Sequence, residues 1–518
     1  MVYTYFPLLS IVATARNDNH GGDLLQRMQI FINGILAQSE KYQVPVELIL
    51  VEWNPPPDKP KLAQALLWPE GYSFCTIRII EVPFKIHARY QHAANLPLYQ
   101  MIGKNVGIRR ARGQYILVTN IDILFSDEIF AYFSIGKLEK GKIYRIDRYD
   151  VKKDIPSNIN IEKQLNYCMN NVIRINEKQG TFDPSTNKYH SICQHDEDEW
   201  IPIYTNACGD FQLMHQEHWH QLRGYAEFDM YSFYLDAILE YSAYYSGLEE
   251  IQLKDPFRIY HIEHAMGSGW TPEGKEILNN RLKNANIPQV INNERLILKY
   301  IMEQNDKAYI FNNENWGLAL DVLLETVTIS ASWEQDTISS KESYFKMENN
   351  LKVDDYYSTL CKEPELYQQL IVKISSDLFR LILKNYTIRL KNHLFGADGE
   401  QKNIIIFGLG EACRDFMLPL LKRHKIKPTY IIVNAKDNIC SEFQGIKVLP
   451  VNTILAEEKK NILIIISSFT NSHKMQEQLG SLGFLKDQHF YCMIQRDVLL
   501  VKSLWPFISE EKDLFLHV

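Results

Sequence analysis

The residues best placed to do chemistry follow a strongly apolar segment. The stretch at 113–126 reads GQYILVTNIDILFS, so Asn120 and Asp122 come directly after strand-forming residues and are two positions apart. An oxygen pair with this spacing at a strand end can hold a hard divalent cation, and such a cation neutralises a bound diphosphate. The same residues also fit a plain turn before a helix that begins at Ser126 or Asp127. The local pattern leaves both interpretations open.

Polar residues also close two earlier strand-like segments. The segment SIVATARND ends with Thr14, Arg16 and Asp18 near its last apolar position, and ELILVEW ends with Glu52 beside an aromatic residue. A carboxylate and an aromatic ring there could receive a ribose and a base. Three strands that all end in polar groups at one sheet edge describe a nucleotide pocket better than three unrelated turns do. We therefore expect these four residues to line a nucleotide site.

The elements that must position these side chains alternate over the first 120 residues. The apolar spacing predicts strands at 8–15, 46–52, 77–82 and 115–120, and helices at 23–39 and 105–112. Alternation of this kind predicts a mainly parallel α/β sheet with helices on its faces, in which ligands bind at the carboxyl ends of the strands. The polar, Asn- and Lys-rich region at 152–190 predicts a surface loop or flap.

Four segments carry a resemblance to a known family. In order, they read SIVATARND, ELILVEWNPP, KNVGIRRARGQYILVTNIDILFS and TNACGDFQLM. Together they resemble the inverting family-2 glycosyltransferases of the GT-A fold, over roughly residues 8–285, and look most like a bacterial subgroup linked to surface-polysaccharide genes. The resemblance implies transfer of a sugar from a nucleotide-sugar donor to a hydroxyl of a glycan or lipid-linked acceptor.

The resemblance also implies a metal site. In that family a DxD motif at this position binds a divalent metal, Mn²⁺ or Mg²⁺, together with the donor diphosphate. Asp122 occupies the coordinating position, whereas Asn120 stands where the first acidic residue is expected and is kept as a donor-site contact. A histidine often completes the metal shell in GT-A enzymes, and neutral imidazole suits Mn²⁺. His264 is the choice here, because His261 lies inside a predicted strand.

Two further carboxylates match the acceptor side of the family. Asp210 ends an NACGD segment, which in the family lines the acceptor pocket, although a turn ahead of a strand fits the local sequence equally well. Asp236 lies near the start of a predicted helix at 231–246 and matches the catalytic aspartate that takes the acceptor proton. Asp229 is the reserve candidate. A helix N-terminal carboxylate favoured by the dipole is the plain alternative for Asp236.

Composition limits the class of protein. With 518 residues, 46% hydrophobic and 23% charged, the chain predicts a globular protein of two or three domains. A net charge of −7 without a basic arm argues against nucleic acid as a partner. The apolar opening lacks a positive leader, the longest apolar runs are strand-sized, and the eight cysteines form no CxxC pair. We expect a soluble cytoplasmic protein without a transmembrane segment, and leave peripheral membrane contact and oligomerisation open.

The C-terminal region predicts a separate α/β unit. The pattern turns helical from 328 to 399, and a strand at 403–407 then runs into the turn Gly408-Leu-Gly410. This turn suits a diphosphate, but Cys413 replaces the third glycine of the dinucleotide fingerprint. We predict a GT-A domain at 1–327, a helical spacer at 328–400 and a small Rossmann-like accessory domain at 401–518.

The predicted function is that of a metal-dependent, inverting, hexosyltransferase-like enzyme of surface-polysaccharide biosynthesis. Two rivals stay open. The glycine turn could bind a nicotinamide in an NAD(P)-dependent oxidoreductase, with the first domain as substrate binder. The loss of an acid at Asn120 could instead mark a catalytically inactive glycan-binding protein.

Overall fold

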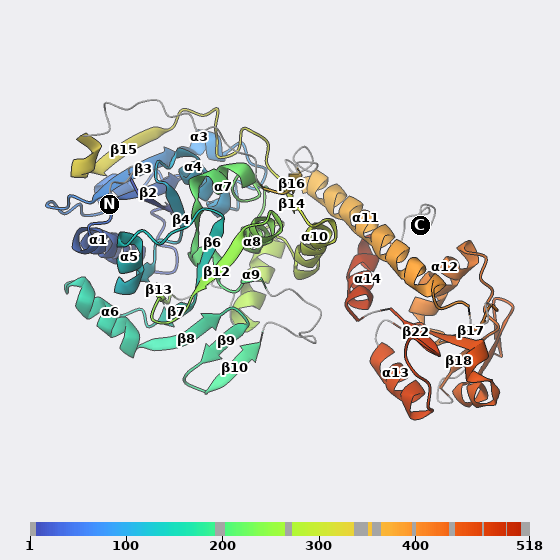
Figure 1. The fold of residues 1–518 in the computed structure, drawn as a ribbon. Helices are drawn as coiled ribbons and strands as arrows, with labels where there is room; N and C mark the ends of the chain where they lie inside the picture. The colour runs from blue at the N-terminus through green and yellow to red at the C-terminus, as the bar shows by residue number, and fades with distance from the viewer. Residues whose placement is uncertain are drawn as a thin grey trace. The chain divides into compact units, whose positions relative to one another are not determined.

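The computed structural model divides the chain into two compact units, residues 1–370 and 371–518 (Figure 1). It describes residues 7–191, 203–264, 272–335, 351–354, 364–395, 400–434, 441–468, 471–493 and 495–508. The limits at 327 and 400 stay predictions, because compactness does not test which segments fold by themselves.

The main sheet of the first unit is mixed, with a parallel centre. Its order is β12-β6-β11-β4-β1-β2-β3-β15. These strands are β1 (Leu9–Ala15), β2 (Val46–Trp53), β3 (Cys75–Val82), β4 (Tyr115–Val118), β6 (Lys142–Ile146), β11 (Gln212–His215), β12 (Glu249–Leu253) and β15 (Leu324–Ile329). Strands β4, β1, β2 and β3 run parallel, whereas β11 and β15 pair antiparallel with β4 and β3. The predicted α/β architecture is confirmed.

Two helices bury the opposite faces of β1. Ile11 and Ala13 pack in the same apolar cluster as residues of α1 (Leu24–Tyr42). The other face meets α4 (Gln100–Arg110), where glycines allow close approach. A Cβ at Gly103 would lie 2.6 Å from the Thr14 side chain. Burial on both faces explains the near-continuous apolar runs of the central strands, and the tight packing against α4 fixes the end of β1.

A second sheet lies outside the predicted pattern. Its order is β10-β9-β8-β7-β13-β5. The strands are β5 (Ile123–Phe125), β7 (Arg148–Val151), β8 (Val172–Glu177), β9 (Gly180–Asp183), β10 (Lys188–Ser191) and β13 (Ile259–Ile262). The prediction of a loop over 152–190 is wrong, since this region holds α6 (Ile161–Asn170) and β8 to β10. Most side chains of β8 are partly exposed and those of β10 are exposed throughout, so the composition of this region is polar despite its regular structure.

The remaining elements of the first unit are short strands and helices around these sheets. The helices are α2 (Leu62–Ala65), α3 (Phe84–His87), α5 (Asp127–Ser134), α7 (Gln216–Leu222), α8 (Leu235–Tyr245), α9 (Pro272–Asn284) and α10 (Asn292–Asn305). The strands β14 (Ala308–Tyr309) and β16 (Val353–Asp354) form a small parallel pair. Of the segment predicted to be helical, 328–399, the described residues hold the long helix α11 (Pro364–Lys391) but also the end of β15 and strand β16.

The second unit has the strand order of a doubly wound dinucleotide-binding sheet. Its strands are β17 (Asn403–Phe407), β18 (Tyr430–Val433), β19 (Glu442–Phe443), β20 (Ile446–Pro450), β21 (Ile462–Ile466) and β22 (Phe490–Cys492). The parallel strands follow the order β20-β18-β17-β21-β22, which is 3-2-1-4-5 when they are numbered along the chain. The helices are α12 (Leu418–Arg423), α13 (Ser472–Ser481) and α14 (Gln495–Ile508). The predicted Rossmann-like topology is confirmed.

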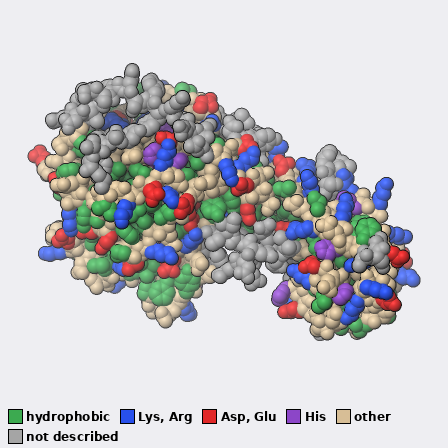
Figure 2. Space-filling view, viewed as in Figure 1, with side chains coloured by type: hydrophobic (Ala, Val, Ile, Leu, Met, Phe, Trp, Pro, Cys, Tyr) green, Lys and Arg blue, Asp and Glu red, His purple; other side chains and the backbone are tan. Residues whose placement is uncertain are grey.

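The described surfaces carry charge of both signs. On the face shown in Figure 2, acidic and basic side chains are interspersed over both units. Within the described residues, no helix is both long and apolar enough to span a membrane. The five cysteines that the structure describes are buried and form no disulfide with one another.

Candidate metal and donor site

Three polar strand ends meet at one edge of the main sheet, as predicted. Because β1 and β2 run parallel in register, Thr14 lies beside Val51 and the end of β1 lies beside Glu52. Strand β4 also runs parallel to β1 and ends at Val118, shortly before Asp122 in the sequence. The turn with Asn120 and Asp122 links β4 of the main sheet to β5 of the second sheet. The metal-motif residues therefore stand where the two sheets join.

Asp122 is the centre of the site. Its Oδ2 atom lies 3.0 Å from Nη1 of Arg27, 3.4 Å from Nε2 of His264 and 3.9 Å from Nε2 of His261. The side chain is only 9% exposed. Burial disfavours the charged form, but the two histidines and Arg27 outweigh it and hold the pKa of Asp122 well below its usual range. Asp122 is thus a carboxylate at neutral pH, held among nitrogen atoms.

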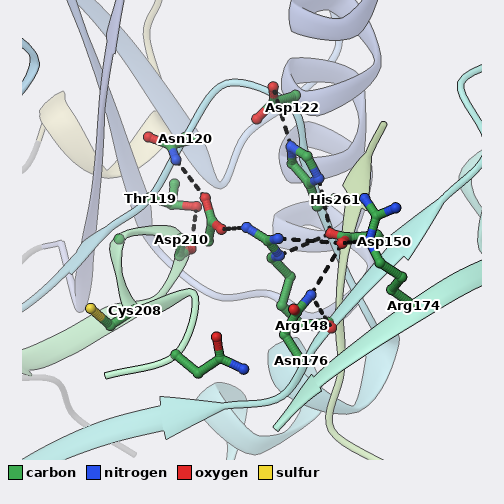
Figure 3. Close-up of polar contacts among 12 residues, drawn as sticks. Thr119, Asn120, Asp122, Arg148, Asp150, Arg174, Asn176, Cys208, Asp210 and His261 are labelled. Carbon is green, nitrogen blue, oxygen red and sulfur yellow. Dashed lines mark hydrogen bonds and ion pairs between the residues drawn. The ribbon is translucent and has the colours of Figure 1, made fainter. Parts of the chain in front are cut away.

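A second carboxylate, Asp150, supports His261 from behind. Strands β13 and β7 pair so that the two residues stand side by side, and Nδ1 of His261 lies 3.0 Å from Oδ1 of Asp150 (Figure 3). Arg148 and Arg174 each place Nε 2.9 Å from an oxygen of Asp150, and Asn176 donates to it at 3.1 Å. Burial alone would raise the pKa of Asp150, but Arg148, the hydrogen bond from His261 and Arg174 lower it well below the usual range.

Asn120 is part of a hydrogen-bonded chain that explains its amide. Its Nδ2 donates to Oδ1 of Asp210 at 2.5 Å (Figure 3). Its Oδ1 accepts from Nε2 of Gln100 at 2.9 Å. Arg148 donates to the other oxygen of Asp210 at 2.6 Å. Strand β11 is antiparallel to β4, so the segment before β11 lies against the residues after β4. An aspartate at 120 could not donate, and it would face Asp210 with like charge.

Of the two candidate bases, Asp236 is less engaged by the protein. Asp229 accepts from the hydroxyl of Tyr99 at 2.7 Å and from the backbone N–H of Gln91 at 2.6 Å, one bond on each oxygen. Asp236 lies half-buried in the first turn of α8, where Oδ1 accepts from the backbone N–H of the next residue. Tyr234, just before this helix, has a φ of 65°, a strained value for a bulky residue.

Asp236 and Asp210 also lie near each other. A Cβ on Gly209 would stand 2.8 Å from Oδ2 of Asp236, so the backbone just before Asp210 lies against that carboxylate. The buried Lys104 donates to the carbonyl of Gly209 at 2.9 Å and fixes the same segment. The two residues predicted for the acceptor side therefore belong to one neighbourhood.

The residues predicted to line the nucleotide site, Arg16, Asp18 and Glu52, all make contacts with the protein itself. Arg16 donates from Nε to the carbonyl of Asn54 at 2.7 Å and pairs with Asp18 at 3.0 Å. The carboxylate of Glu52 is buried and accepts from the backbone N–H of Leu62 at 2.9 Å; burial raises the pKa of Glu52 to about 7. It therefore faces the interior rather than a ligand.

The aromatic residue expected to receive a base does not do so. Trp53 is fully buried, and its Nε1 donates to Nδ1 of His87 at 3.0 Å. Stacking of a base on this ring is ruled out by its burial. The prediction failed because a strand that is covered on both faces buries the side chain after its last polar residue as well.

Sequence reasoning missed several members of the site. Arg27 lies on the apolar face of α1, and a charge among residues at helical spacing is a usable signal. His261 was noted, but an inner strand position gave no reason to choose it. Asp150, Arg148 and Arg174 gave no local signal, because the second sheet that carries them was not predicted.

Comparisons with known proteins give little on identity. No protein-family model matches the chain. No curated protein matches it either. Among solved structures, the chain is similar to one described as GalNAc-T7 with UDP, GalNAc and Mn²⁺, at 12% identity and a TM-score of 0.30. That match covers 57% of this chain and half of the other, and a likeness at this level carries no argument about function.

Proposed function

We propose that the first unit is a metal-dependent glycosyltransferase that moves a sugar from a nucleotide-sugar donor to a hydroxyl of a glycan or lipid-linked acceptor. One observation carries the proposal. Asp122, His261 and His264 present ligand atoms within 4.8 Å of one another at the carboxyl edge of a parallel sheet, where α/β proteins bind nucleotides. The residues that we assign to the donor come from three of the four resembling segments, and the strands that carry them end at the same edge.

The residues of this edge fit a divalent cation. Metal–ligand bonds of about 2.1 Å put neighbouring ligand atoms about 3–4 Å apart. The separations of 3.4 and 3.9 Å from Asp122 to the two histidines lie in that range. A set of one carboxylate and two imidazoles suits Mn²⁺. Arg27 shares Oδ2 of Asp122 and adds positive charge beside the place for a diphosphate.

The chain's own residues then divide the work. A cation bound at Asp122 would stabilise the diphosphate leaving group. Asp236 takes the proton of the acceptor hydroxyl as the sugar carbon is attacked, which gives inversion at that carbon. Asp210 lies beside Asp236 and holds the acceptor side in shape through its pairs with Asn120 and Arg148. We further propose surface-polysaccharide biosynthesis in the cytoplasm as the setting.

The second unit supports a separate nucleotide-binding role. Its 3-2-1-4-5 order reverses direction between β17 and β21, and Gly408-Leu-Gly410 follows β17 at that point. Gly408 has a φ of 104°, which favours glycine. A nicotinamide-dependent oxidoreductase would place its cofactor there. Tight NAD(P) binding with no nucleotide-sugar binding would select this second candidate over the first.

One experiment separates these functions. The full chain is screened by thermal shift against UDP-, GDP-, CMP- and dTDP-sugars with and without Mn²⁺, and turnover is measured with the donor that binds. Asp122→Asn should abolish the metal-dependent part of the shift. Asp236→Asn should keep donor binding but lower turnover by about 10²-fold or more, since the amide cannot take the proton. Binding that is insensitive to Mn²⁺ in both wild type and Asp122→Asn, or retention at the sugar carbon, would overturn the proposal.

A further inference from the structure

We infer that His261 is a third protein ligand of the proposed cation and that Asp150 is its orienting carboxylate. The inference rests on the proposed function and deepens it. His261 lies in β13 of the second sheet, so the metal would join the two sheets of the unit: Asp122 arrives from the end of the main sheet and His261 from the second one.

The hydrogen bonds of His261 fix which nitrogen faces the metal. Nδ1 lies 3.0 Å from Oδ1 of Asp150 and donates its proton to that carboxylate. In neutral imidazole the lone pair is then on Nε2, which faces Oδ2 of Asp122 at 3.9 Å. That separation is too long for a hydrogen bond, and it suits two atoms that bind one cation. A carboxylate behind a histidine ligand is the usual support of such ligands.

Asp150 is held firmly enough for this task. Both of its oxygens are taken: Arg148 pairs with Oδ1, while Arg174 and Asn176 bond Oδ2. The side chain is fully buried. Because the carboxylate cannot rotate without breaking these contacts, the imidazole of His261 is held in one orientation toward Asp122.

A separate cation on the other side of His261 is disfavoured. Asp150, His261 and Glu263 also lie close enough together to bind a metal. However, Arg174 pairs with both Asp150 and Glu263, and Arg148 pairs with Asp150 as well. Two guanidinium groups already supply the positive charge for these two carboxylates, so a dication there would meet like charge. We therefore assign one metal per chain.

The first test counts histidine ligands without any substitution. The full chain, with ¹⁵N-histidine, is loaded with Mn²⁺ alone and studied by pulsed EPR beside the unlabelled protein. Two coupled histidine nitrogens are expected, from His261 and His264. A single coupled histidine would overturn the inference, and a stoichiometry of two Mn²⁺ per chain would favour the second group of ligands instead.

Variants then identify the residues. His261→Gln and Asp150→Asn should each weaken Mn²⁺ binding about 10–100-fold, as measured by calorimetry, and His261→Gln should leave one coupled histidine. His218→Gln is the matched control, since His218 is also buried in the first unit but bonds Gly141 and Gln221. It should bind Mn²⁺ as wild type does.

The outcomes separate this inference from the proposed function. If wild type binds no Mn²⁺, or Asp122→Asn binds it unchanged, the metal site as a whole falls. If Asp122→Asn loses Mn²⁺ while His261→Gln keeps wild-type affinity, only the role of His261 falls. Should His261→Gln not fold, the count of labelled nitrogens in wild type decides alone.

Discussion

Replacing Asn120 by the aspartate of the DxD motif should destabilise this protein. The substitution Asn120→Asp would give the DxD pattern of the resembled family, and from the sequence alone it should improve metal binding. The structure predicts otherwise, because the amide donates to Asp210 at 2.5 Å. A carboxylate cannot donate there, so the variant would lose a buried hydrogen bond and gain a like-charge contact.

The size of the effect follows from that distance. Two carboxylates about 3 Å apart repel by about 5 kcal/mol at an effective dielectric constant of 20. Taking up one proton instead costs about 4 kcal/mol at pH 7, since an ordinary carboxyl has a pKa about three units lower. Protonation of one carboxyl costs less free energy than the repulsion and therefore sets the loss of stability. The ion pair between Asp210 and Arg148 reduces that loss in part. We expect Asn120→Asp to lose about 2–4 kcal/mol of unfolding free energy at pH 7.

The loss should depend on pH with a defined sign. The folded variant holds a proton between its two carboxyls that the unfolded chain releases above pH 4 or so. Folding therefore takes up a proton, and stability should fall as pH rises from about 5 to 7.5, by about 1.4 kcal/mol per unit. Asn120→Ala is the control: it loses the same hydrogen bonds without adding charge, so its loss should not vary with pH.

Urea unfolding followed by tryptophan fluorescence measures this directly. Of the eight tryptophans, all but Trp505 precede residue 371, so the signal reports mainly the first unit. Mn²⁺ binding is titrated in parallel. An Asn120→Asp variant as stable as wild type at pH 7.5, or one that binds Mn²⁺ more tightly, would refute the account of Asn120 given by the structure.

Two further predictions concern the rim of the site. Gly21→Ala and Gly22→Ala carry similar backbone strain, with φ values of 72° and 77°, but only at Gly21 would the new Cβ meet a neighbour, 2.5 Å from Nδ1 of His264. Gly21→Ala should therefore weaken Mn²⁺ binding about 10-fold relative to Gly22→Ala, and equal affinities in calorimetry would contradict a role for His264. Glu52→Gln should gain stability over wild type as pH rises from about 4 to 7. Burial raises the pKa of Glu52 to about 7, so in this range the unfolded wild type loses a proton that the folded state keeps, and wild type alone becomes less stable. A difference in urea unfolding that is constant with pH would speak against this.

The fold could be predicted where periodicity is strong. The central strands are apolar throughout because both faces are covered, and their polar ends meet at one edge of the sheet, as predicted. The second sheet could not be predicted, because its outer strands alternate weakly and expose polar side chains. Because that sheet was not predicted, the pairing of Asp150 with His261 could not be predicted either, since the two residues are 111 positions apart in the sequence.

Charge balance ties these parts of the site together. Three buried or nearly buried carboxylates are each matched by a guanidinium group. The pairs are Asp122 with Arg27, Asp150 with Arg174, and Asp210 with Arg148. The cluster is close to neutral before any ligand arrives, so Mn²⁺ should bind more weakly alone than with a ligand that brings negative charge. A diphosphate carries the opposite charge to the same place. The donor diphosphate should therefore tighten Mn²⁺ binding, and Arg27, which backbone carbonyls of His20 and Gly22 hold beside Asp122, adds positive charge at the same place.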